Sequence, residues 1–488
     1  MRDSLTIQTI VLLAGRLSKA GIQIILPIIL VRLISPGDYG IYKFIFLVQG
    51  TIFVALPMGM IQSLYFFVPK GQTPKIYIRQ SLLYLHLISG LVLAIGFIFS
   101  VPFSQIIKAE NNYLLYLIVL PSLILPILSA PIEITLLAEK KAHYASLVTV
   151  VNGLFSTGIL LGCAIIFRTI YALMIGLLVH CFLKLLITEI YFQKRYKIFT
   201  LDGINRQSLR AHFSFAIPLG AAGLAGFLQV RLDHYVVSYY FDSAMYATYA
   251  VAAFGIPFAV YFYNSVADVT IVRYRQLALN NQLNEMILVW DKATRRLSTV
   301  FVPLVVLFLL LADPLVPFLF TEKFAGAIPF YRVLLLLWLS YCFNPASFVR
   351  AFRTTRYLLF VQMACMIVSC VSLLILVKYF GMLGAAISCV SVVWLSTILL
   401  TQKVASLAST SIINLIPIRH FCKVFLSTGL AACLLIILRM SIKGALPYLV
   451  IGTITFCIVY LIVVWRIGVL AEEDKKLFFG FLKKGVEM

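Results

Sequence analysis

The sequence predicts an all-α polytopic membrane protein, and three observations carry that prediction. Hydrophobic residues fill 62% of the 488 positions, against about 45–50% in an average soluble protein. Charged residues make up only 12%. The apolar residues gather in continuous runs of about 18 or more, the length a helix needs to cross a bilayer, and do not alternate as in a membrane barrel. Soluble enzymes, secreted disulfide scaffolds and disordered chains are therefore excluded.

Apolar runs bounded by charges, Pro or Gly predict about fourteen membrane-spanning helices. The predicted spans are 7–33, 41–68, 79–101, 113–138, 143–167, 170–192, 211–232, 244–267, 297–320, 328–349, 357–378, 382–402, 420–440 and 446–465. The connections between them are short, and none is long enough to form a separate catalytic domain.

The positive charges predict the orientation of the chain. Of the 40 Lys and Arg residues, 27 fall on one side of the predicted spans and 10 on the other, with 3 inside spans. Because cytoplasmic loops carry the excess of Lys and Arg, we expect both termini in the cytoplasm. This distribution also explains the net charge of +22 without a nucleic-acid partner.

The chain repeats itself weakly. Residues 35–42, before the second span, align with residues 242–249, before the eighth, at an offset of 207. Each segment enters a helix through a capping residue and carries a Tyr pair three positions apart; Pro36 strengthens the first helix start. Residues 167–173 align with 380–386 at an offset of 213, in both cases at a tight turn between paired spans.

The repeat predicts the domain organisation. We expect an N-terminal six-helix lobe at 1–200, a second at 201–410, and two additional helices with a cytoplasmic tail at 411–488. An even number of spans per lobe keeps both copies in one orientation, so a pseudo-two-fold axis should run along the membrane normal.

Cations in the first span are the leading candidates for a binding site. Arg16, Lys19 and Gln23 recur at helical spacing on one face. A buried unpaired charge costs at least about 2.5–3.5 kcal/mol in hydrocarbon, so such residues usually face a wet cavity or a partner. The alternative is that Arg16 and Lys19 extend toward the cytoplasmic headgroups. A cationic wall with few acids would attract a phosphate or pyrophosphate group.

Three further residues are candidates for substrate binding. Lys184 lies near the middle of the sixth span, with His180 one turn earlier on the same face. Arg231, at the outer end of the seventh span, is a minor candidate because the aligned lobes would bring this span opposite the first. A structural role is an equal alternative for the first pair.

Glu133 and Asp268 are the acidic residues that we expect to lie deepest in the predicted spans. They are the candidates for coupling a proton or sodium ion, the one cofactor left open, although an interfacial ion pair is the simpler reading. His86 is expected to be a hydrogen-bonded structural residue. The nine cysteines show no ligand spacing, so no metal site is predicted.

Enzyme signatures are not found. The sequence contains no GxSxG, HExxH or phosphate-binding loop motif, and it is predicted not to be an enzyme.

Residues 32–42, Arg-Leu-Ile-Ser-Pro-Gly-Asp-Tyr-Gly-Ile-Tyr, and residues 381–386, Gly-Met-Leu-Gly-Ala-Ala, resemble segments of the bacterial polysaccharide (O-antigen type) flippases. These belong to a superfamily that includes multidrug exporters and the lipid II flippase. The resemblance implies a protein of the bacterial inner membrane. It would move an anionic, undecaprenyl-pyrophosphate-linked oligosaccharide to the outer leaflet by alternating access through a central cavity. Membrane lipids, a glycan polymerase and other polysaccharide assembly proteins are the implied partners.

Two alternatives remain at this point. A multidrug antiporter of the same superfamily should carry acidic residues deep in a lobe, whereas this chain carries basic ones. A membrane-embedded glycan polymerase or transferase should have a large outer loop, and the outer loops here are short.

Overall fold

The structure is a computed structural model that describes residues 21, 24–70, 74–100, 113–139, 141–197, 200, 204–256, 259–352, 355–442 and 444–469. Within these ranges all regular structure is helical. Ten helices are long and apolar enough to cross a membrane, or eleven if one bent pair is counted as a span. The all-helical membrane class is therefore confirmed. The number fourteen stays a prediction, because most of the first predicted span lies outside the described residues.

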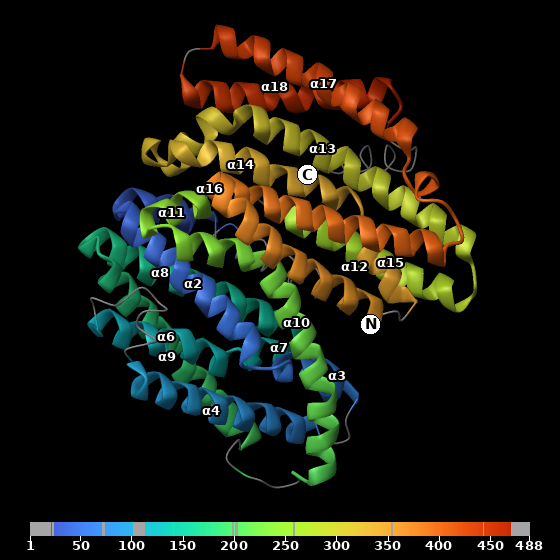
Figure 1. Cartoon of the computed structure of the whole chain (residues 1–488). Coiled ribbons are helices and arrows are strands. Elements are labelled where there is room, and N and C mark those ends of the chain that lie inside the picture. Colours follow the sequence, from blue (N-terminus) through green and yellow to red (C-terminus); the bar gives the residue numbers. More distant parts are fainter. Residues whose placement is uncertain are drawn as a thin grey trace, which may run out of the picture. The chain divides into compact units, whose positions relative to one another are not determined.

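The chain forms two compact units, Met1–Ala250 and Val251–Met488. The helices of the first unit, labelled in Figure 1, are α2 (Pro36–Ala55), α3 (Met60–Lys70), α4 (Pro74–Ile98), α6 (Tyr113–Ser129), α7 (Pro131–Ala138), α8 (Ala142–Phe167), α9 (Ile170–Tyr196), α10 (Arg206–Tyr240) and α11 (Ser243–Ala252), the last crossing the boundary. In this unit α10 packs against α2 and α3. This division does not test the sequence repeat, so the lobes 1–200, 201–410 and 411–488 stay a prediction.

The second unit continues with helices and short 3₁₀ turns. They are α12 (Ala259–Leu279), α13 (Leu283–Phe320), η1 (Glu322–Ala327), α14 (Ile328–Leu335), η2 (Leu336–Cys342), α15 (Pro345–Ala351), α16 (Thr355–Leu407), η3 (Ile413–Leu415), α17 (Ile418–Ser441) and α18 (Ala445–Arg466). Its core includes Trp290 and Phe348, and the Trp290 indole donates to the Leu415 carbonyl oxygen at 2.8 Å.

Helix α2 starts as the sequence predicts. Ser35 caps it by accepting from the Asp38 amide at 3.1 Å, and Pro36 occupies the first turn, where a missing amide hydrogen costs nothing. The span then bends by 45° between α2 and α3. At the bend Gly59 adopts φ +77°, a conformation that favours glycine.

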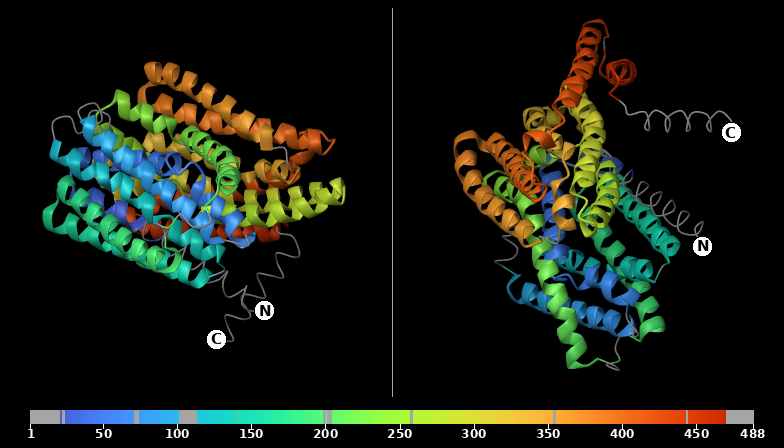
Figure 2. Two further views of the ribbon diagram at one scale, coloured as in Figure 1. Left: turned by 90° about the horizontal axis from the view of Figure 1, so that it is seen from below. Right: turned by 90° about the vertical axis from the view of Figure 1, so that its right-hand side faces the viewer.

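Helix α16 is a hairpin of two antiparallel legs rather than one straight helix. Its chain reverses at Gly381, where φ is 58° and ψ is −139°. The legs are joined by the Ser372 and Ser388 hydroxyls, 2.6 Å apart. The Tyr357 hydroxyl also donates to the Leu399 carbonyl oxygen at 3.2 Å. Figure 2 shows the orange legs side by side in both views. The tight turn predicted at this position is thus present.

The C-terminal hairpin α17–α18 packs on α13. The Tyr460 hydroxyl donates to the Thr299 carbonyl oxygen at 2.7 Å, and the Arg439 guanidinium donates to Asp313 at 3.0 Å. These contacts fix the hairpin to α13 at two separated levels.

Candidate functional site

The leading sequence candidates, Arg16, Lys19 and Gln23, lie outside the described residues. Their role as a cationic wall therefore stays a prediction. The remaining candidates fall within the described part of the chain, and the structure shows what surrounds each of them.

Lys184 and Glu133, predicted to act separately, form an ion pair. The Lys184 Nζ of α9 lies 3.7 Å from the Glu133 Oε1 of α7, and both side chains are mostly buried. Two charges in an apolar setting stabilise each other, because each offsets the desolvation of its partner. The pair thus joins a predicted anion-binding residue to a predicted coupling acid.

His180 lies one turn before Lys184 on α9, as predicted from the spacing. Its Nε2 is 3.1 Å from the Asn152 Oδ1 of α8, while its buried Nδ1 has no hydrogen-bond partner among the described residues. His86 has a structural environment, as expected: its Nδ1 is 2.8 Å from the Leu82 carbonyl oxygen and its Nε2 is 3.1 Å from Glu189. The sequence reading missed Glu189 as an acid within a span.

The two copies of the repeated motif meet in the first unit. A Cβ placed on Gly40 would lie 1.8 Å from the Ser243 carbonyl oxygen, so the starts of α2 and α11 approach each other at backbone distance. Both starts are capped as predicted, the second by Asp242, whose Oδ1 accepts from the Met245 amide at 2.8 Å. Phe44 packs edge-on against Tyr246 beside this contact.

A charged and aromatic cluster surrounds the C-terminal part of α10. Arg231 is exposed and lies close enough to Lys43 of α2 to interact with its charge. Lys43 also stands over the Tyr39 ring at 5.4 Å. Asp233 is buried, and its Oδ2 accepts from the Tyr249 hydroxyl at 2.7 Å. Asp233 therefore lies in the packed interior of the first unit.

Asp268 is the other acid predicted to couple an ion. It is exposed in the middle of α12, in the second unit, whereas the Glu133–Lys184 pair belongs to the first. Its coupling role stays a prediction.

Asp313 is an acid within a span that the sequence reading overlooked. It lies within the apolar α13 and accepts from two arginines, Arg332 at 2.8 Å and Arg439 at 3.0 Å. A cavity of about 580 Å³ with a mixed polar and apolar lining opens beside it, lined also by Glu322 and Tyr448. An acid inside a predicted span was the signal that could have found it.

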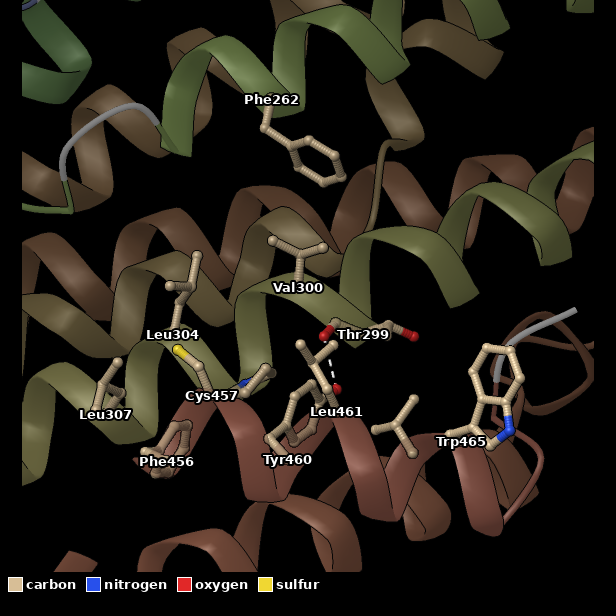
Figure 3. A pocket seen from close by; sticks show the side chains of 12 residues that line it. Phe262, Thr299, Val300, Leu304, Leu307, Phe456, Cys457, Tyr460, Leu461 and Trp465 are labelled. Carbon is tan, nitrogen blue, oxygen red and sulfur yellow. Dashed lines mark hydrogen bonds between the residues drawn. The ribbon is translucent and has the colours of Figure 1, made fainter. Parts of the chain in front are cut away.

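An apolar groove of about 600 Å³ lies between α13 and α18, with Phe262 of α12 at its edge. Figure 3 shows Leu304, Leu307, Phe456 and other aliphatic and aromatic side chains along its walls, with the Tyr460 hydroxyl turned away to its partner on α13. Walls of this kind accept hydrocarbon and offer little to a polar ligand.

Glu139 joins the C-terminal ends of α7 and α9. Its carboxylate accepts from Lys141 at 2.7 Å, from Arg195 at 3.0 Å and from the Tyr196 hydroxyl. Burial acts to raise the pKa of Glu139, but the hydrogen bonds from these three partners outweigh it and lower the pKa.

The described residues therefore offer ion pairs, an apolar groove and a second cavity with charged residues in its lining. Within the same ranges no group of His, Cys, Asp or Glu could hold a metal ion.

The fold is shared with known membrane transporters. It is similar to the lipid II flippase MurJ in an inward closed conformation, with a TM-score of 0.69, 14% sequence identity and coverage of 94% of this chain and 98% of that chain. It is also similar to an inward-facing multidrug resistance MATE transporter of the MOP superfamily, with a TM-score of 0.61, 14% identity and coverage of 82% and 99%. A third similar structure is a MOP superfamily transporter from Pyrococcus furiosus, with a TM-score of 0.55, 15% identity and coverage of 82% and 95%.

These similarities define the class as a multi-pass membrane protein with the MurJ and MATE fold. Residues 29–329, well over half of the chain, match the family described as "Polysaccharide biosynthesis protein", and the chain belongs to that family. The resemblance seen in residues 32–42 is thereby confirmed. No curated protein sequence matches the chain.

Proposed function

We propose that the protein is a flippase that moves an undecaprenyl-pyrophosphate-linked oligosaccharide from the cytoplasmic to the outer leaflet of the bacterial inner membrane. One combined observation carries the proposal. A chain of the polysaccharide biosynthesis family has, over 94% of its length, the fold of a protein described as a lipid II flippase. In the proposed pathway the lipid-linked precursor must move from the cytoplasmic to the outer leaflet before the polysaccharide is assembled. A flippase fold suits that transfer.

The chemistry of the described residues supports an amphipathic, anionic substrate. The apolar groove between α13 and α18 offers walls suited to a hydrocarbon chain. Lys184, which Glu133 neutralises at 3.7 Å, would be released to a phosphate that displaces the carboxylate. The proposed site also includes two cations of the first span, Arg16 and Lys19, with the neutral amide of Gln23 on the same face. His180 and Arg231 are the weaker members of the proposed set.

The finer expectations from the sequence belong to the same proposal. The transporter would have fourteen spans, two six-helix lobes and cytoplasmic termini, and it would work by alternating access through a cationic cavity. A proton or sodium ion would drive it, with Glu133 and Asp268 as the proposed coupling acids. A glycan polymerase and other assembly proteins would take up the product.

The test is transbilayer movement of a fluorescent lipid-linked oligosaccharide in proteoliposomes, read as loss of protection from a membrane-impermeant quencher. We expect the wild-type protein to move the lipid and the double variant R16Q/K19Q to lose at least about tenfold in rate, equivalent to about 1.4 kcal/mol. The matched control is R206Q/R210Q, which removes the same charge from an exposed helix start.

Each result has a consequence. No movement by the wild-type protein would overturn the flippase proposal. Equal rates for wild-type protein and R16Q/K19Q would remove these two cations from the mechanism. Efflux of a cationic dye, without movement of the glycolipid, would favour the multidrug antiporter instead.

A further inference from the structure

The cavity of about 580 Å³ beside Asp313 lies in the second unit, where the C-terminal hairpin meets the end of α13. Its lining comes from four elements and includes Asp313 and Phe318 of α13, Glu322 of η1, Arg439 of α17 and Tyr448 of α18. Charged and apolar side chains therefore share one lining. The proposed substrate site consists of other residues.

The cavity lies at the level of a membrane surface. Helix α13 ends at Phe320, and the chain reverses between Ser441 and Ala445, where one candidate span follows another. The ends of spans lie at the lipid headgroups. The distribution of Lys and Arg predicts that this surface is the outer one. A ligand in the cavity would therefore meet water on one side and hydrocarbon on the other.

The charged part of the lining carries both signs. The Arg439 Nη1 and the Arg332 Nη2 donate to the two carboxylate oxygens of Asp313, at 3.0 and 2.8 Å. A guanidinium has five N–H donors, so Arg439, whose side chain is 54% exposed, keeps donors for a second oxyanion. Within the described ranges the exposed Glu322 takes no part in these ion pairs. The lining thus offers a guanidinium to a phosphate and a carboxylate to an ammonium group.

The apolar part of the lining continues along α13 toward the apolar groove. Pro314 and Phe318 line the cavity, and Pro303 and Leu307 line the groove. These four residues follow one another at spacings of four, seven and four, which places them on one face of the helix. At about 1.5 Å per residue, Pro314 lies about 10 Å from Leu307 and about 16 Å from Pro303 along α13. One leaflet contributes about 15 Å of hydrocarbon, half the thickness of the bilayer core. An acyl chain that starts at the cavity therefore reaches the near end of the groove.

We propose that this cavity binds the headgroup of a phosphatidylethanolamine molecule, with one acyl chain of that lipid lying along α13. The phosphate accepts hydrogen bonds from Arg439, and the ammonium group donates to Glu322. An anionic phospholipid would bring its phosphate beside two carboxylates without a cation to match them. Phosphatidylcholine carries the same charges, but its quaternary ammonium group has no hydrogen to donate. The inference goes beyond the proposed function and does not depend on it.

The test is a lipid titration of the purified full-length protein in detergent, with the bound lipid counted by native mass spectrometry. Three probes carry two oleoyl chains each and differ in the headgroup: phosphatidylethanolamine, phosphatidylglycerol and phosphatidylcholine. We expect the first phosphatidylethanolamine to bind at least about tenfold more tightly than either of the others. Equal affinities would mean non-specific surface lipid and would overturn the site. Tighter binding of phosphatidylglycerol would overturn the pairing of an ammonium group with Glu322.

A water-soluble competitor tests whether the ligand is a membrane lipid. Glycerophosphoethanolamine has the same headgroup without acyl chains, so it should not displace the bound phosphatidylethanolamine at equal concentration. Displacement would overturn the assignment to a lipid and would favour a soluble zwitterion. The titration uses no transport substrate, so its outcome is separate from that of the flippase assay.

A variant of Glu322 tests the headgroup contact. In E322Q the carboxylate is replaced by a neutral amide, so we expect the preference for phosphatidylethanolamine over phosphatidylcholine to fall from about tenfold to less than about twofold. The matched control is E285Q, which removes an exposed carboxylate from the first turn of α13, at the opposite end of that helix. E285Q should keep the wild-type preference. An unchanged preference in E322Q would overturn the role of Glu322.

A steric variant tests the position of the ligand without changing any charge. Ala445 lines the cavity and is exposed, so A445W places an indole in the space of the headgroup. We expect A445W to bind phosphatidylethanolamine at least about tenfold more weakly than wild-type protein. L446W is the matched control, because Leu446 is 52% exposed and lies outside the lining of this cavity. Equal binding by A445W and wild-type protein would overturn the placement of the headgroup in the cavity.

Discussion

Gly40 and Ser243, which belong to the two copies of the repeated motif, touch at the backbone. A side chain at position 40 would begin 1.8 Å from the Ser243 carbonyl oxygen, whereas a Cβ at Gly37 in the same helix would meet only the Ser35 hydroxyl oxygen at 4.0 Å. The repeat is thus a packing contact in the folded chain as well as a pattern in the sequence.

Gly40→Ala should destabilise the protein. Ser243 or α2 must move to admit the methyl group, and overpacking of this kind costs about 1–3 kcal/mol. Thermal unfolding in detergent, followed by intrinsic fluorescence, measures the effect. Gly37→Ala is the matched control and should leave the midpoint near that of wild-type protein; equal midpoints for both variants would contradict the close contact.

The Lys184–Glu133 pair should show coupling in a double-mutant cycle. E133Q and K184Q each remove one charge of the ion pair, so each should unfold at a lower temperature than wild-type protein. E133Q/K184Q leaves neither and should recover part of the loss, with a coupling free energy of about 0.5–1 kcal/mol. If the losses of the two single variants simply add in the double variant, the ion pair at 3.7 Å contributes no coupling free energy.

The contribution of Glu139 to stability should depend on pH. Its pKa is lowered in the folded protein, so the folded state favours the ionised form and the stabilisation is present above the ordinary glutamate value of 4.5. The stabilisation should be lost as the pH falls through the lowered pKa. Comparing unfolding midpoints of wild-type protein and E139Q from pH 7 to pH 3 tests this: the wild-type advantage should shrink below about pH 4.5. A difference that is constant with pH would contradict the ion-pair account.

Asp313 should hold the C-terminal hairpin to α13. D313N weakens two charge-assisted hydrogen bonds at once, to Arg332 and to Arg439, and leaves both cations without a counter-charge. R439Q removes only the link to α17. We expect proteolysis between α17 and α18 to be fastest in D313N, intermediate in R439Q and slowest in wild-type protein. Equal cleavage rates would assign the anchoring to the Tyr460 contact instead.

Local features were predictable because they depend on neighbouring residues. The spans 143–167 and 170–192 correspond to α8 (Ala142–Phe167) and α9 (Ile170–Tyr196), with the connection between them placed correctly. The start of α2 at Pro36 also followed from its capping pattern. Helical periodicity and capping are local, so one sequence is enough to find them.

Partners across helices were not predictable. Spacing placed His180 and Lys184 on one face, but it could not show that Glu133, fifty-one positions earlier, lies opposite. The same holds for the hydrogen bonds that join Ser63 of α3, Gln80 of α4 and His212 of α10, because these residues come from three different helices. Asp313 differs, because its position in an apolar span was visible and only its two arginine partners were not.

The reversal at Gly381 has a consequence for how the second unit is made. Both legs of α16 belong to one uninterrupted stretch of chain, and a Cβ on Gly384 would lie 2.0 Å from the Leu376 carbonyl oxygen, so the turn leaves no room for a looser arrangement. Contacts between such close neighbours in sequence form quickly. During biosynthesis the legs can therefore pair as soon as they leave the ribosome and enter the lipid together, giving later segments a finished surface on which to assemble.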